Sequence, residues 1–353
     1  MTPSISSPTI LEQTDAWKEE FGFDLLAWAP LPQPTQFQFY SNWLKEQRHG
    51  DMKYLETHAP LKEDPARVFG EARSLISVAV LYKPHPEPLP ETPTGVRLAA
   101  YAQGGDYHDW LSARLTSFAE ALKSQHPGLE YLVATDSKPL LERDLANQLG
   151  LGWTGKNTCL IHPKVGSFFL IGELLTNIDI ADFTAPEPVP DFCGKCTRCM
   201  DACPTGAIVE PRKLDATKCI SYWTIESKSI APEPVRSQIG DWFFGCDICQ
   251  DVCPWNEKAL RLKPSALVPR SREQEIEDLR FFLTASNREI ERRLGASPVL
   301  RGRPRGLRRN AMVVAGNLGL QDLKEEIARW TTDADLGELA RWAFEKISRA
   351  PAS

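Results

Sequence analysis

Eight of the nine cysteines in the chain lie within residues 193–253, and their spacing is the strongest chemical signal in the sequence. The first run has the spacing C-x2-C-x2-C-x3-C-P, the second has C-x2-C-x3-C-P, and one cysteine stands alone between them. This spacing is typical of thiolate ligands of cubane [4Fe–4S] clusters. The eight residues are Cys193, Cys196, Cys199, Cys203, Cys219, Cys246, Cys249 and Cys253.

The second run is incomplete, because a full copy of the first would need a cysteine where the chain has Phe243. Cys219 is the obvious replacement. In two-cluster ferredoxins the fourth cysteine of each run binds the other run's cluster, so we predict two sets of four ligands. Paired structural zinc sites are the alternative, but these usually show two separated C-x2-C pairs. The predicted sets are Cys193, Cys196, Cys199 and Cys253 for one cluster, and Cys203, Cys219, Cys246 and Cys249 for the other.

Composition places the chain among ordinary globular proteins. It has 353 residues, 42% of them hydrophobic and 25% charged, with a formal net charge of −6. That length predicts two or three domains. No apolar run reaches membrane-spanning length, and residues 1–7 lack the basic and apolar regions of a secretory signal. Thiolate ligands fit a reducing compartment. We therefore expect a cytoplasmic monomer with no membrane partner.

The elements before the cysteines predict an α+β domain over residues 1–185. Apolar periodicity predicts helices over 8–21, 106–125 and 138–149, and a helical pair over 36–58. Runs of apolar and β-branched residues predict strands over 23–28, 74–82 and 129–135, and paired strands over 158–162 and 167–175 around Gly166. Prolines predict a loop over 83–93 and a linker over 185–190.

The cysteine-rich module is predicted to span residues 186–262, and an all-helical region to span residues 263–353. Helical patterns recur over 276–283, 287–294, 307–318, 323–330 and 336–347. Short helices in pairs suggest a small HEAT-like solenoid.

Arginine is concentrated at the start of the helical region. Residues 270–309 hold eleven arginines and six acidic residues, although the whole chain is acidic. Such a cluster can attract a phosphate backbone. Ion pairs on a solvated helical face would explain the same composition. We select Arg305, Arg308 and Arg309 as candidate nucleic-acid contacts.

Two further places could hold chemistry. Asp136 follows the predicted strand 129–135 and precedes a helix, where aspartate is more typical of an N-cap than of a catalytic acid. Residues 152–157 form a glycine-rich turn with Lys156 and Asn157, but they lack the frame of a phosphate-binding loop. The turn could still cradle a large polar cofactor.

Several segments, in the same order along the chain, resemble those of the epoxyqueuosine reductase family. The resemblance runs from about residue 15 to residue 320. It rests on Gly105–His108, Asp136-Ser, Leu141–Arg143, Gly150–Asn157, Gly166–Phe169, Cys203–Pro211, Cys219–Tyr222 and Phe244–Cys249.

The resemblance implies a nitroreductase-like cobalamin-binding domain, a module with two [4Fe–4S] clusters and a HEAT-like region that helps to hold tRNA. It implies reduction of epoxyqueuosine to queuosine at the tRNA wobble position, as the last step of queuosine biosynthesis. Cobalamin, two clusters and an external one-electron donor would then be required. A proton must reach the epoxide oxygen as the carbon–oxygen bond breaks, because alkoxide leaves poorly.

By family position Asp136 is the implied proton donor, and Arg143, with Tyr107 and His108, belongs to the same pocket. Cys159 remains outside the cluster ligands, and we expect it to be a small buried residue. The implied cobalamin contacts are Arg67, Asp136, Thr154, Lys156, Asn157, Ser221, Gly245, Cys246 and Asp247.

Two other functions remain open from the sequence. A reductive dehalogenase also uses cobalamin and two cubanes, but its respiratory members carry a twin-arginine signal that residues 1–7 do not show. An electron-transfer subunit would have clusters and no cobalamin. Absorbance of bound cobalamin separates that subunit from the reductase.

Overall fold

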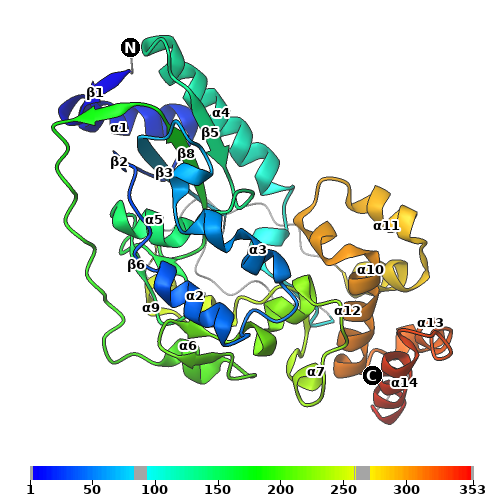
Figure 1. Cartoon of the computed structure of the whole chain (residues 1–353). Coiled ribbons are helices and arrows are strands. Elements are labelled where there is room, and N and C mark those ends of the chain that lie inside the picture. Colours follow the sequence, from blue (N-terminus) through cyan, green and yellow to red (C-terminus); the bar gives the residue numbers. More distant parts are fainter. Residues whose placement is uncertain (1–2, 83–93, 258, 260–270, 351–353) are drawn as a thin grey trace.

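The computed structural model describes residues 3–82, 94–257, 259 and 271–350, and Figure 1 traces the whole chain. The loop predicted at residues 83–93 lies outside the described residues. The chain is a mixed α/β protein. A sheet flanked by helices forms the first half, and short cysteine-bearing elements lead to a helical region in the second.

An antiparallel sheet in the order β2-β3-β8-β5 forms the centre of the first half. Burial of β3 between β2 and β8 explains why its sequence is mostly apolar, with two buried serines, and does not alternate. The strand predicted at 74–82 is confirmed, and the one predicted at 23–28 begins two residues later. The strands are β2 (Leu25–Pro30), β3 (Ser74–Leu81), β8 (Phe169–Thr176) and β5 (Tyr131–Ala134).

Helices cover both faces of this sheet (Figure 1). On one face α1 (Ser7–Phe21) and α4 (Tyr107–Gln125) bury Trp17 and Phe118 against β2, β3 and β8. On the other face α5 (Glu142–Gln148) buries Leu145. The helices predicted at 8–21 and 106–125 are confirmed. The helix predicted at 138–149 is shorter, which leaves residues 136–141 as a turn.

The prediction that residues 158–162 pair with 167–175 is wrong. β7 (Leu160–Ile161) pairs with β6 (Trp153–Thr154), and a single bridge joins His162 to Gly166. β8 is too apolar for a surface hairpin and lies between β3 and β5. The helical pair predicted at 36–58 is present as α2 (Phe37–Lys45) and α3 (Lys53–Lys62), and β1 (Ser4–Ser6) pairs with β9 (Asp179–Ala181).

The cysteine region consists of short elements and contacts the first half through a strand pair. In that pair β12 (Trp242–Phe244) lies parallel to β4 (Arg97–Leu98), which precedes the 3₁₀ helix Ala100–Ala102. The other elements are α6 (Arg198–Ala202), β10 (Ile208–Glu210), β11 (Lys213–Leu214), a π-helix η4 (Tyr222–Glu226), α7 (Val235–Gln238), α8 (Ile248–Asp251) and α9 (Pro254–Glu257).

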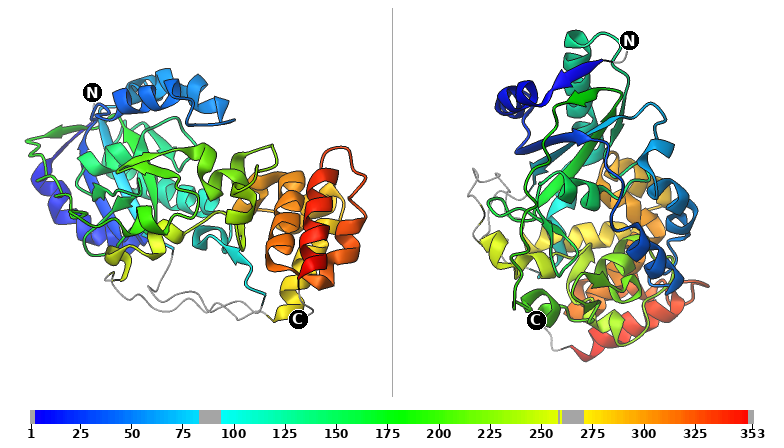
Figure 2. Two further views of the ribbon diagram at one scale, coloured as in Figure 1. Left: turned by 90° about the horizontal axis from the view of Figure 1, so that it is seen from below. Right: turned by 60° about the vertical axis from the view of Figure 1, so that its left-hand side comes forward.

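The five helices predicted after residue 275 are confirmed, and they pack at one end of the molecule (Figure 2). The central α12 shares a hydrophobic core with Ile220 and with residues 242–244 of the cysteine region. The helices are α10 (Arg272–Thr284), α11 (Asn287–Leu294), α12 (Arg303–Leu318), α13 (Lys324–Ala328) and α14 (Gly337–Arg349). Within the described residues, no helix combines the length and apolar character needed to cross a bilayer.

Candidate functional site

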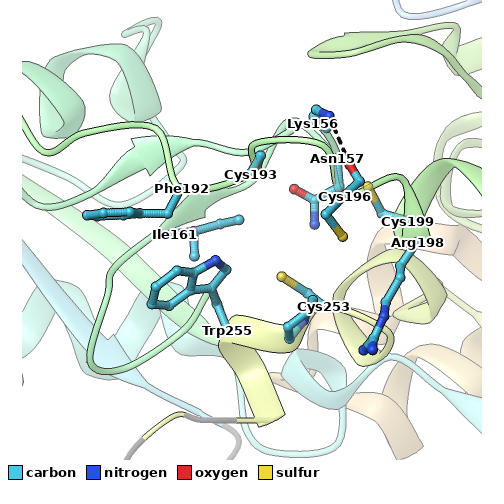
Figure 3. A pocket seen from close by; sticks show the side chains of 11 residues that line it. Lys156, Asn157, Ile161, Phe192, Cys193, Cys196, Arg198, Cys199, Cys253 and Trp255 are labelled. Carbon is cyan, nitrogen blue, oxygen red and sulfur yellow. Dashed lines mark hydrogen bonds between the residues drawn. The ribbon is translucent and has the colours of Figure 1, made fainter.

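The four cysteines predicted to bind the first cluster line one pocket (Figure 3). Cys196 is exposed, whereas Cys253 is buried. Burial raises the pKa of Cys199 to about 11, and the neighbouring thiols of Cys193 and Cys253 raise it further. Among the described residues, no three His, Cys, Asp or Glu side chains have already converged into a metal-binding geometry. The four thiols therefore share one pocket, and their donor chemistry fits an iron–sulfur cluster.

The glycine-rich turn at residues 152–157 holds this first cysteine loop in place. Lys156 Nζ donates to the carbonyl oxygens of Gly194 at 2.7 Å and Cys196 at 2.9 Å. Trp153 Nε1 lies 3.4 Å from Cys193 Sγ. Trp153, Phe192 and Trp255 stack edge-on or tilted beside the pocket, with ring centroids 5.1–5.3 Å apart. The turn is thus a docking element for the cysteine region.

The second set of cysteines lies further inside, and none of its four members is exposed. Burial raises the pKa of the Cys246 thiol, and the nearby Cys219 and Cys203 raise it further. The Cys249 thiol has its pKa raised first by a hydrogen bond with Cys159, then by burial, and also by Cys246 and Cys219. The structure therefore brings the four predicted ligands near one another.

Cys159 has a different environment from the one predicted. It is only partly buried, and its thiol contacts that of Cys249, which lowers the pKa of Cys159. This contact could not be predicted from the sequence, because Cys159 lies 90 residues before Cys249 and no spacing pattern connects them.

Two side chains of the helical region, Arg309 and Asn310, hold the segment after Cys219 by hydrogen bonds. Arg309 on α12 donates from Nη1 to the carbonyl oxygens of Ser227 at 2.5 Å and Ser229 at 2.8 Å, and from Nη2 to that of Trp223. Asn310 Nδ2 donates to the carbonyl oxygen of Thr224 at 2.7 Å. A π-helix leaves its carbonyl groups in an irregular pattern, and these side chains satisfy them.

Asp136 lies in the turn at the end of β5, next to the aromatic side chains of α4. Its backbone has φ of 57°, a left-handed conformation uncommon outside glycine. Its backbone N–H donates to Glu142 Oε1 at 2.8 Å, and its Oδ2 accepts from Tyr107 Oη at 3.1 Å. The N-cap interpretation of Asp136 is wrong, because α5 begins at Glu142 and Leu141 is its N-cap residue.

Tyr101 lies between the Asp136 turn and the segment that carries Cys246 of the second set. Burial raises the pKa of Tyr101, and the charges of Asp247 and Asp136 raise it further, so both carboxylates lie near its ring. Asp247 Oδ2 accepts from the Ala100 N–H at 2.7 Å. The Gly245 N–H donates to Thr224 Oγ1 at 3.0 Å. Asp136 and Asp247 thus lie on the two sides of Tyr101, and Gly245 and Cys246 directly precede Asp247 in the chain.

Other predicted contacts point elsewhere. Arg67 is 52% exposed and donates to the Pro60 carbonyl oxygen at 3.0 Å. Asn157 Nδ2 donates to the Cys249 carbonyl oxygen at 3.2 Å, and the Thr154 carbonyl oxygen accepts from Arg212 at 3.0 Å. Arg143 is exposed and donates to the Thr158 carbonyl oxygen at 2.7 Å. These side chains hold loops together in this structure.

Two of the three candidate nucleic-acid contacts are not on the surface. Arg308 and Arg309 are only 6% and 4% exposed. Arg308 donates to the carbonyl oxygens of Phe282 at 3.1 Å and Ala285 at 2.8 Å. Burial lowers the pKa of Arg309 to about 10, and the charge of Arg305 adds to that effect. Only Arg305 is exposed, and it pairs with Asp335 at 3.2 Å.

Comparison with known proteins agrees with this arrangement. Residues 192–256 match the family model of the 4Fe-4S double cluster binding domain, and residues 62–137 match that of epoxyqueuosine reductase QueG, DUF1730. The chain is 34% identical over 320 residues to epoxyqueuosine reductase from Salmonella typhimurium, an alignment covering 90% of this chain and 82% of that protein. It is 40% identical over 230 residues to the enzyme from Cyclobacterium marinum, covering 65% and 73%.

Solved structures give the same result. An epoxyqueuosine reductase crystallised with an epoxyqueuosine-modified tRNA-Tyr stem loop superposes with a TM-score of 0.82 at 26% identity, covering 96% of this chain and 90% of that one. The Bacillus subtilis enzyme, with its catalytic aspartate loop swung out of the active site, superposes with a TM-score of 0.81 at 27% identity, covering 96% and 91%. The chain therefore belongs to the epoxyqueuosine reductase family and is an oxidoreductase with a 4Fe–4S double cluster binding domain.

Proposed function

We propose that this chain removes the epoxide oxygen of epoxyqueuosine in tRNA, giving queuosine as the last step of that nucleoside's biosynthesis. The observation that carries the proposal is the Asp136 turn, which presents an exposed carboxyl group beside Tyr107. The relatives' names and the stem-loop complex of a similar enzyme support it. The reaction consumes two electrons and two protons and releases water.

We infer that cobalamin binds between Asp136 and residues 245–247. A corrinoid is a large ligand with an apolar face and amide side chains, and such ligands need apolar walls with a few fixed polar groups. The residues present fit it: the rings of Tyr82, Tyr101 and Tyr107 are buried or half-buried here, and Tyr101 packs against Tyr107 and Phe244. Cobalamin, when bound, supplies an electron-rich centre for reduction of the substrate.

In this proposal Asp136 gives a proton to the epoxide oxygen as the carbon–oxygen bond breaks. Its Oδ2 is oriented by the Tyr107 hydroxyl group, which fixes where the proton is held. Tyr101 and Tyr107, with ring centroids 6.1 Å apart, form an aromatic wall on one side of the acid.

The cysteine arrangement supports an external one-electron donor approaching the first ligand set. Cys196 is exposed, whereas all four members of the second set are partly buried, and that set lies nearer to Asp247 and Tyr101. The first set therefore faces a partner and the second faces the proposed cobalamin region. That the chain acts as a monomer stays a prediction.

We further propose that the three regions divide this work at the boundaries expected from the sequence. Residues 1–185 would form a nitroreductase-like cobalamin-binding domain, residues 186–262 the two-cluster module, and residues 263–353 a HEAT-like region that contributes to tRNA binding. The exposed arginines Arg301, Arg303 and Arg305 support the last role.

The test is incubation of reduced, reconstituted protein with tRNA containing epoxyqueuosine, followed by mass spectrometry of the nucleosides. We expect loss of one oxygen from the modified base and absorbance of bound cobalamin. Asp136→Asn should keep the clusters and cobalamin but lower turnover by about 10²- to 10⁴-fold, the usual contribution of a general acid.

Asp182→Asn is the matched control, because Asp182 is also exposed and has φ of 54° but lies after β9, away from the site. It should keep full activity. Full activity of Asp136→Asn would remove the aspartate from the mechanism, and no oxygen loss with the unmodified chain would refute the proposed reaction.

A further inference from the structure

Two further carboxyl groups, Glu142 and Glu173, lie behind the proposed proton donor, and the reaction proposed above accounts for neither. Glu173 on β8 is 0% exposed, and neither of its carboxyl oxygens has a hydrogen-bond partner in the part of the chain that the structure describes. It lies opposite Ala134 in the β5–β8 register, two residues before Asp136. An ionised carboxylate without a partner is expensive to bury, so Glu173 must hold a proton. Burial raises its pKa, and the charge of Glu142 raises it further.

Glu142 interacts with both Glu173 and Asp136. It is the first residue of α5, it is half-buried, and its Oε1 accepts the Asp136 N–H at 2.8 Å. Burial raises the pKa of Glu142 to about 8, and the charge of Asp136 contributes to that increase. Two neighbouring carboxyl groups cannot both ionise cheaply, so such a pair keeps one proton at a pH where an isolated carboxyl group would have lost it.

The other charged groups around Glu142 and Asp136 do not cancel the increase in the pKa of Glu142. Lys62 and Arg143 favour the ionised form of Glu142, but burial outweighs both. Lys62 Nζ donates to the Leu140 carbonyl oxygen at 2.7 Å, and burial lowers its own pKa. The charged and titratable groups that face Asp136 or Glu142 from the packed elements are Tyr54 and Lys62 on α3, Tyr101, Tyr107 on α4, Arg143 on α5 and Glu173 on β8.

We propose that Glu142 is a positioning residue that shares one proton with Asp136 and holds the Asp136 turn through its backbone N–H, while Glu173 stays neutral behind the pair. This inference rests on the proposed function. In each turnover the pair gives one proton to the epoxide oxygen as the carbon–oxygen bond breaks, and solvent supplies the second proton that completes the released water. Solvent returns the proton through the exposed side of the pair, and the electrons come from the external one-electron donor.

Glu142→Gln separates the two roles, because the amide oxygen still accepts the Asp136 N–H but the side chain holds no exchangeable acid proton. With the native chain, single-turnover rates should stay constant up to about pH 8, the pKa of Glu142, and fall above it. With Glu142→Gln the fall should begin at least one pH unit lower, with at least a tenfold loss at pH 7.5 and recovery towards acidic pH. Glu142→Ala should be slower at every pH, because the turn also loses its acceptor.

Two matched variants sharpen the test. Glu173→Gln keeps a neutral group of the same shape, so the pH profile should not move. Glu187→Gln changes an exposed glutamate in the linker and should match the native chain. An equal loss at all pH values in Glu142→Gln would overturn proton sharing. A shifted profile in Glu173→Gln alone would also overturn it, because the group that titrates would then be Glu173.

Infrared titration of the purified protein tests the pair without any substrate. A protonated carboxyl band should disappear near pH 8 in the native chain, and this titrating component should be absent from Glu142→Gln. If the native chain converts no epoxyqueuosine but shows the band, the proposed reaction fails and the carboxyl pair stands. If the band is missing in a chain that is active, the pair fails and the reaction stands.

Discussion

The cysteine region at residues 193–253 and the arginine-rich segment at residues 270–309 both have a strong compositional signal, but the fold treats them differently. The two predicted cysteine sets stay together: the first lines one pocket, and members of the second shift one another's pKa. The arginines separate. Arg305 faces solvent, whereas Arg308 and Arg309 bind backbone carbonyl groups in the interior.

The difference shows what a residue pattern can encode. Ligands of one cluster must lie close together, so short spacings along the chain already impose much of their geometry. A charge has no such requirement. Whether an arginine binds a phosphate or satisfies buried carbonyl groups depends on the face of α12 to which it belongs, and packing decides that.

The largest expected effect concerns the cysteines that are predicted to bind the clusters. Cys249→Ser should lower the iron content from about eight to about four atoms per chain and abolish turnover, because one cubane loses a ligand. Cys159→Ser is the control, since its thiol contacts Cys249 without belonging to either predicted set. Iron analysis and electron paramagnetic resonance measure both. Iron loss in Cys159→Ser would show that spacing chose the wrong ligand.

The next prediction compares the buried Arg309 with the exposed Arg305 by their effects on stability. Arg309→Ala should lower the free energy of unfolding by about 3–5 kcal/mol, because it leaves buried carbonyl groups without donors. It should also loosen the π-helix after Cys219 and reduce occupancy of the second cluster. Arg305→Ala should change stability by less than about 0.5 kcal/mol, as expected for an exposed residue. Urea unfolding followed by fluorescence gives the free energies of unfolding. Equal losses in the two variants would contradict the different roles assigned to Arg305 and Arg309.

The smallest expected effect concerns tRNA. Arg305→Ala should weaken binding modestly and lower the slope of log affinity against log salt by about 1, as for loss of one phosphate contact. Arg349→Ala is a suitable control, because Arg349 is 80% exposed and paired with Glu345 but lies on α14, outside the arginine-rich segment. Filter binding at several salt concentrations measures both. Equal slopes for the two variants would assign Arg305 to the solvated face.

Much of the fold could be predicted from local pattern. Buried strand β3 and helices α1 and α4 appear where apolar periodicity places them, because each buries its apolar residues against the same sheet. The pairing of β7 could not be predicted this way. Residues 158–162 and 167–175 are close in sequence, but β8 gains more by lying between the buried strands β3 and β5.

By itself the sequence determined the cluster chemistry and the family, because ligand spacing and ordered motifs are properties of the linear chain. The tertiary structure decided which side chains share a site. Only folding brings Glu142 and Glu173 behind Asp136, sets Cys159 against Cys249, and points Arg309 at the π-helix. Most of these contacts join residues far apart in sequence, and their energies depend on burial, which no linear spacing specifies.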